Sequence, residues 1–305
     1  MKRKSKAGNF LIRISVILAV ITAVVFSVYM ALDKWIVPKY FKAYGINNMQ
    51  ELVSTMKTLY TSPKENKMIT NGFTKVDENS ATDKLINAGF PTSHDGSVDY
   101  GAFAEVQQNN LNPGEYKFTD KELAAIINQM LQSGVLRNKL PNLKYIETTS
   151  INVLELDITP TAYEEDGEIK YSNRSAKIKF IFKFDTNSVR SQISEVMDTP
   201  MFLLNMILPR TLYITSEFDI EINDDGEYIM TNGTVAINNR TVEQSQILLD
   251  MLIGFIFEQQ DQMTTEKLIS EFEKIIPNGL KFLGKVSFEN EINASKSKGV
   301  ILTIE

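Results

Sequence analysis

The chain of 305 residues contains no cysteine and a single histidine. Without cysteine there can be no disulfide, no thiolate zinc site and no cysteine nucleophile. A Ser–His–Asp triad or a histidine-bearing metal site would have to use His94, which lies in the turn-rich stretch Pro91–Gly96. Turn preferences alone explain such a stretch, so we interpret His94 as a solvated loop residue.

The sequence signatures of common enzyme classes are also missing. There is no GxSxG, P-loop, HExxH or glycine-rich dinucleotide motif. The acidic runs Glu164–Asp166 and Asp224–Asp225 each precede a glycine, which is typical of solvated hairpin tips. The second run lacks the twelve-residue ligand spacing of a calcium loop. We therefore expect a protein that is not an enzyme and has neither a metal nor another cofactor.

The longest uncharged stretch lies near the N-terminus. Ile14–Leu32 runs 19 residues without a charge, enough for a helix about 28 Å long that would cross a bilayer. Residues 1–13 hold five cations and no acidic residue, and such a cluster stays cytoplasmic. A cleaved signal peptide is the alternative, but its apolar core is usually shorter, and Tyr29 disfavours cleavage after Ala31. We predict an uncleaved signal anchor in the cell membrane, with the rest of the chain extracytoplasmic.

The extracytoplasmic part is acidic. The whole chain has 32 basic and 38 acidic residues, and 27 basic residues remain once the five N-terminal cations are set aside, a net charge of −11. This charge disfavours binding to nucleic acid and electrostatic docking onto anionic lipid. An exported body without cysteine depends on its core for stability, which favours a Gram-positive bacterium whose surface lacks a disulfide-forming system.

Helical and strand patterns divide the chain into four parts. The basic tail (1–13) and the anchor (14–32) precede a stalk and irregular subdomain (33–115), in which only 48–60 and 80–88 suggest helices. From 116 to 305 we predict an α+β domain with an antiparallel sheet. Its clearest signals are a capping box at Thr119–Glu122, strict alternation at 176–184, and hairpin turns at 166–167 and 224–226. Further helices are expected at 187–208, from 241 and at 264–276, and strands at 145–159, 283–292 and 299–305.

Two helical segments, 201–208 and 247–257, are apolar nearly all round and need an apolar partner. That partner is either the sheet's own core or a groove between sheet and helix that holds an acyl chain. Under the second alternative the candidate wall residues, chosen for their periodicity, are Ile126, Ile127, Met130, Ile178, Phe180, Phe182, Leu248, Leu252 and Phe255.

Three segments resemble the YpmS family of membrane-anchored proteins in Gram-positive bacteria. Phe118–Leu131 (FTDKELAAIINQML) resembles the start of that family's domain, Thr211–Arg240 resembles its strand–turn–strand hairpin, and the tail from Ile276 is similar to its C-terminal end. The chain departs from the family in 33–115 and around 187–210. The family is placed near the tubular lipid-binding (TULIP) proteins, in which a curved antiparallel sheet wraps a long helix. The resemblance implies a lipid-binding or lipid-handling module and brings no catalytic residues.

Two functions therefore stay open. The first is a membrane-anchored, extracytoplasmic protein that binds a membrane lipid or another acyl-chain ligand in an apolar groove. The alternative is an anchored interaction or regulatory module of the wall, division or secretion machinery, with a fully packed core and no ligand. The sequence names neither the lipid nor a protein partner.

Overall fold

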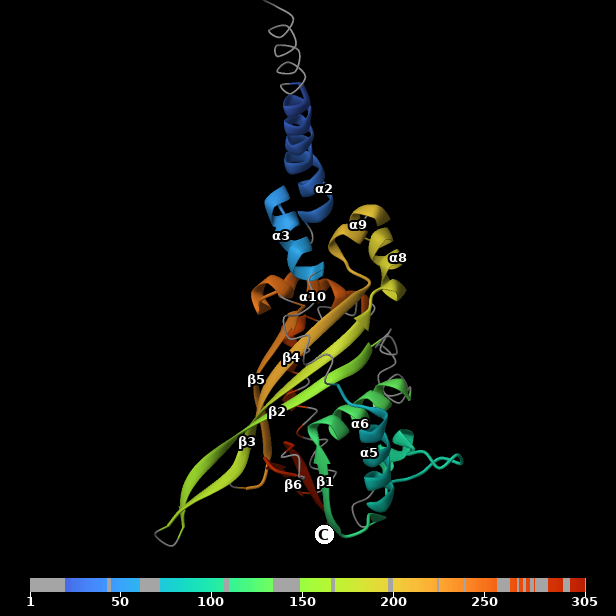
Figure 1. Ribbon diagram of the computed structural model, residues 1–305, viewed down its shortest axis with the longest axis vertical. Helices are drawn as coiled ribbons and strands as arrows, with labels where there is room; N and C mark the ends of the chain where they lie inside the picture. Colours follow the sequence, from blue (N-terminus) through green and yellow to red (C-terminus); the bar gives the residue numbers. More distant parts are fainter. Residues whose placement is uncertain are drawn as a thin grey trace, which may run out of the picture.

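The structure is a computed structural model. It describes residues 20–42, 45–60, 72–106, 110–133, 149–165, 168–196, 200–223, 225–238, 240–256, 285–292 and 297–304, together with separate positions between 264 and 277. Within these residues the chain is α+β, as predicted, with an apolar N-terminal helix and two antiparallel sheets. Figure 1 shows an elongated body, and the apolar helix leaves it at one end.

The N-terminal helix is described from Val20 to Phe41, and its 22 residues are long and apolar enough to cross a membrane. Its side chains are mostly exposed as far as Trp35. A π-helical turn, η1 (Leu32–Ile36), then leads into α2 (Val37–Phe41), whose first turn holds Pro38. The predicted apolar N-terminal helix is therefore confirmed; residues 1–19 lie outside the described part of the chain.

The larger sheet has four antiparallel strands in the order β2-β3-β4-β5. Each strand pairs with its neighbour in sequence, which confirms both predicted hairpins. Gly226 has a positive φ of 75° in the second turn, a conformation that glycine adopts without steric cost. The strands are β2 (Thr149–Glu165), β3 (Glu168–Asp185), β4 (Thr211–Ile222) and β5 (Tyr228–Ile237).

A smaller antiparallel sheet is formed by β1 (Gly114–Thr119), β7 (Gly299–Ile304) and β6 (Lys285–Glu289), in the order β1-β7-β6. Strand β1 lies at the border of the region that the sequence predicts to be irregular, and no sequence pattern predicts it. The backbones of β1 and β7 approach closely at Gly299, where an added Cβ would stand 2.0 Å from the Phe118 carbonyl oxygen. The Tyr228 hydroxyl accepts a hydrogen bond of 2.7 Å from the Val286 amide and so joins the two sheets.

The helices gather at the two ends of the body (Figure 1). The expected helix over 187–208 is two helices, α8 (Asn187–Val196) and α9 (Met201–Ile207), and Pro200 is the N-cap of the second. A proline disfavours the helical conformation of the residue before it. Five of the described helices lie at the end from which the apolar helix leaves: α2, α3 (Met49–Tyr60), α8, α9 and α10 (Val242–Ile256). Toward the other end of the described body lie α5 (Lys75–Asn87), the 3-10 helix η3 (Tyr100–Glu105) and α6 (Asp120–Gln132).

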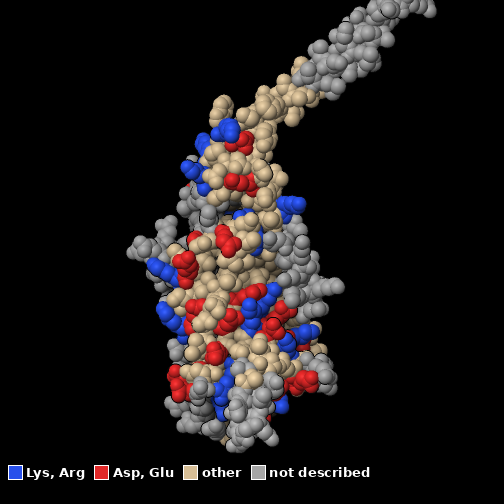
Figure 2. Space-filling model, turned by 90° about the vertical axis from the view of Figure 1, so that its left-hand side faces the viewer, with Lys and Arg blue, Asp and Glu red and all other residues tan. Residues whose placement is uncertain are grey.

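The described residues form two hydrophobic cores. The distal core joins α5, α6 and both sheets, and includes Phe118, Ala124, Leu154, Phe180, Phe218 and Leu302. The proximal core surrounds the C-terminal end of the apolar helix, and includes Phe41, Leu59, Phe184, Leu204, Leu212 and Leu248. Figure 2 shows acidic and basic side chains gathered in a band over the middle of one face of this body.

Candidate functional site

Helix α6 contributes one wall of the candidate site. Its capping box is present as predicted, with Thr119 as the N-cap and Glu122 at the third helical position. Ala124 and Ala125 are buried, and the helix rests on β2, where the Asn128 side-chain oxygen accepts a hydrogen bond of 3.2 Å from the Ile151 amide. Three predicted wall residues of this helix pack against the distal core but stay only half-buried: Ile126, Ile127 and Met130.

Strand β3 contributes the second wall. Phe180 is buried, with its ring centroid 5.8 Å from that of Phe182 and 6.4 Å from that of Phe218. Ile178 and Phe182 belong to the same apolar face, yet they remain half-buried. Their partners on β2, Leu156 and Ile151, are buried. Partly accessible apolar surface therefore persists on β3 as well as on α6.

The structure divides the nine predicted wall residues. The six on α6 and β3 belong to or pack against the distal core. Leu248 is buried in the proximal core instead, next to Leu249 in sequence. Leu252 and Phe255 lie on the backbone of α10, but their side chains are outside the described residues. The six residues on α6 and β3 therefore form the candidate site.

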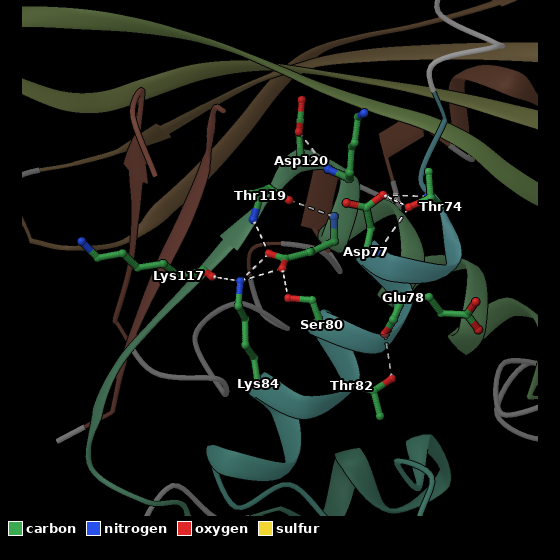
Figure 3. Close-up of polar contacts among 11 residues, drawn as sticks. Thr74, Asp77, Glu78, Ser80, Thr82, Lys84, Lys117, Thr119 and Asp120 are labelled. Carbon is green, nitrogen blue, oxygen red and sulfur yellow. Dashed lines mark hydrogen bonds and ion pairs between the residues drawn. The ribbon is translucent and has the colours of Figure 1, made fainter. Parts of the chain in front are cut away.

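A buried ion pair fixes α6 to α5 beside this site (Figure 3). The Glu122 carboxylate accepts hydrogen bonds from Lys84 Nζ at 2.6 and 2.7 Å, from Ser80 Oγ at 2.5 Å and from the Thr119 amide at 2.8 Å. Lys84 Nζ also donates to the Lys117 carbonyl at 2.7 Å. Because these donors saturate the carboxylate, we interpret the cluster as a structural joint between two helices and a strand.

A second polar contact holds η3 and α5 against α6. Gln129 Nε2 donates a hydrogen bond of 2.9 Å to Glu78, and the Tyr100 hydroxyl donates to the Gln129 side-chain oxygen. Burial, together with the negative charge of Glu78, raises the pKa of Tyr100 to about 12. The phenol therefore keeps its proton well above the pH at which an exposed tyrosine would lose it.

His94 is exposed in a turn closed by the hydrogen bond of 2.7 Å from the Ser93 amide to the Ser97 carbonyl. The Asp95 carboxylate accepts hydrogen bonds from the Ser97 amide and hydroxyl at 3.0 and 2.7 Å. These contacts lower the pKa of Asp95. Among the residues that the structure describes, no cluster of three or more His, Asp or Glu side chains is arranged to hold a metal ion.

The apolar helix is built into the body at its proximal end. Val37 and Phe41 are each 1% exposed and belong to the proximal core. Asp33 accepts a hydrogen bond of 2.8 Å from the Met49 amide, the first residue of α3. Such an acceptor satisfies one of the free N–H groups at a helix start. The body is therefore joined to the helix by packing and a hydrogen bond as well as by the chain.

No family model, curated protein or solved structure matches this chain. The resemblance to the YpmS family therefore stays a prediction, and the function is argued from the geometry of the chain itself.

Proposed function

We propose that the protein is a membrane-anchored, extracytoplasmic lipid-binding protein in which an acyl chain lies between α6 and the apolar face of β3. The observation that carries this proposal is the partial exposure of Ile126, Ile127 and Met130 on α6 together with that of Ile178 and Phe182 on β3. In a fully packed core, large apolar side chains such as these would be buried. Their remaining accessible surface favours an apolar ligand.

The apolar face of β3 also runs without interruption from the proximal core to the distal core. Phe184 lies in the proximal core, and Ala176 lies in the distal core on the same face. At about 3.3 Å per residue, this stretch of strand is roughly 26 Å long, comparable to an extended acyl chain. Each methylene kept out of water contributes about 0.8 kcal/mol, so ten would contribute roughly 8 kcal/mol before the costs of binding.

This arrangement suits the role that the family resemblance implies. In the proposal the larger sheet and α6 form a TULIP-like module, and the N-terminal helix holds that module at the outer face of the cytoplasmic membrane. The lipid tail would leave the bilayer at the proximal end and follow the apolar face of β3 toward α6. The mechanism is physical, since it requires only that little apolar surface meets water on the way.

The proposal can be tested by lipid retention. The full chain is purified in mild detergent, and bound lipid is measured by native mass spectrometry under activation that strips lipid from the membrane helix. The double variant Ile127→Ser/Met130→Ser should bind lipid about thirtyfold more weakly or worse, because each change removes roughly 1–2 kcal/mol of apolar contact. Ile86→Ser is the matched control, since Ile86 packs half-buried against the same core from α5. Equal retention in all three proteins would refute lipid binding at this site.

One observation favours the second candidate function, an interaction module. The pairing of β3 with β4 ends at Ser175–Glu221, whereas β2 and β3 stay paired as far as Glu165–Glu168. Figure 1 shows this two-stranded ribbon projecting from the body away from the apolar helix. Two-stranded ribbons are marginally stable on their own, so a protein partner would stabilise it. Crosslinking from the ribbon in cells would capture a defined partner under this alternative.

A further inference from the structure

Helix α9 has one buried and one exposed apolar side. Leu203 and Leu204 are 7% and 0% exposed and belong to the proximal core. The preceding residues, Met201 and Phe202, are 40% and 68% exposed. Exposing two adjacent large apolar side chains is unfavourable in water and points to an apolar partner.

The exposed side is not a loose loop. Arg190 of α8 donates hydrogen bonds to the Asn205 side-chain oxygen and to the Leu208 carbonyl. Tyr60 of α3 donates to the Asn205 carbonyl. These contacts tie α9 to two other helices, so the exposure of its first turn is fixed by the fold.

The position of α9 identifies the partner. Figure 1 shows α9 at the end of the body from which the apolar helix leaves, and α9 packs against α3. That helix enters the proximal core only two residues after Trp35, which is itself 75% exposed. Trp side chains favour the membrane–water interface, and two residues advance a helix by only about 3 Å. The proximal end of the body therefore begins within one helical turn of the interface.

We propose that the start of α9, with Met201 and Phe202, inserts into the outer leaflet of the membrane that the N-terminal helix crosses. The partner is the lipid bilayer, in the manner of an interfacial apolar anchor. Because α9 and the anchor share the proximal core, two membrane contacts would hold the body at a fixed tilt. A single helix alone leaves the body free to tilt together with the helix axis. The inference rests on the membrane anchoring proposed above, but not on lipid binding at α6.

The chain has no cysteine, so a single introduced cysteine can carry a fluorophore. Full-length Met201→Cys, labelled with an environment-sensitive dye, is placed in nanodiscs with or without phospholipids brominated on their acyl chains. Thr231→Cys, exposed on β5, is the aqueous control, and Ala23→Cys, exposed on the apolar helix, reports the anchor. We expect about twofold quenching at positions 23 and 201 and none at 231.

Quenching at position 23 with a position 201 that behaves like 231 would overturn the α9 contact while leaving the anchor intact. Absence of quenching at position 23 would overturn both. A second measurement uses Phe202→Ser in the labelled Met201→Cys protein, which should lower the quenching at 201 to near the level of position 231. Ile229→Ser, which removes an apolar side chain 45% exposed on β5, should leave the quenching unchanged. Equal quenching with Phe202→Ser and Ile229→Ser would show that the label alone drives insertion.

Discussion

Replacing Lys84 by methionine should destabilise the fold through the carboxylate it leaves behind. The side chain of Glu122 is only 6% exposed, and Lys84 Nζ lies 2.6 Å from its nearer oxygen. Removing one partner of a buried ion pair typically costs about 3–5 kcal/mol. Here the Lys84 side chain is 32% exposed, so water screens part of the attraction. Ser80 and Thr119 also continue to donate to the carboxylate. We therefore expect a loss of about 2–3 kcal/mol in the free energy of unfolding.

The assay is urea unfolding of the full chain in mild detergent, followed by far-ultraviolet circular dichroism. Lys75→Met is the matched control, because Lys75 Nζ lies 3.0 Å from Glu78 but its side chain is 75% exposed. Exposed pairs contribute about 0–1 kcal/mol, so this control should stay close to the unsubstituted protein. If Lys84→Met loses no more stability than Lys75→Met, the joint between α5 and α6 does not stabilise the body as argued.

Two further predictions concern the cores. Phe41→Ala should lower the free energy of unfolding, measured in urea, by about 3–5 kcal/mol, because Phe41 is 1% exposed in a packed core. A loss below about 1 kcal/mol would contradict the packing of the anchor helix into the proximal core. For Tyr100, burial and Glu78 raise the folded-state pKa from 10.0 to about 12. The folded state therefore holds this proton more tightly, and stability should fall by about 1.4 kcal/mol per pH unit as the pH rises from 10 to 12. Tyr100→Phe should remove that part of the slope, and an identical slope in the variant would contradict the burial of the phenol.

The parts of the fold that depend on neighbouring residues could be predicted from the sequence. The capping box at Thr119–Glu122 places both partners within one helical turn, so its letters are sufficient. The hairpins around Asp166 and Asp225 also follow from local turn chemistry and from alternation in the flanking strands. These signals gave the α+β class and the order of the main elements.

The remaining contacts join residues that are far apart in sequence. Lys84 and Glu122 are 38 residues apart, and nothing near either residue marks the other as its partner. Strand β1 pairs with β7, which is about 185 residues later in the sequence. A strand of only six residues that starts with Gly114, directly after Pro113, carries little signal of its own. The capping-box motif identifies Glu122 as a residue of the first helical turn, but its burial against α5 depends on tertiary packing.

Only part of the candidate site could be predicted, because its residues also meet through contacts between distant parts of the sequence. Periodicity identifies which face of an element is apolar, and the choices on α6 and β3 rest on strong patterns. It cannot tell which core that face enters, so Leu248, chosen from an equally apolar helix, lies in the proximal core. The apolar segment around 201–208 likewise supplies both core residues and the exposed pair at the start of α9.

The central claim is the proposal that an acyl chain binds between α6 and β3, and photocrosslinking tests it most directly. Cells that produce the full chain are given a diazirine-bearing fatty acid, irradiated, and the protein is digested for adduct mapping by mass spectrometry. We predict adducts on α6 within 126–130 and on β3 within 178–182, reduced by competing unlabelled fatty acid. Adducts confined to the N-terminal helix, with none on α6 or β3, would contradict lipid binding by the body.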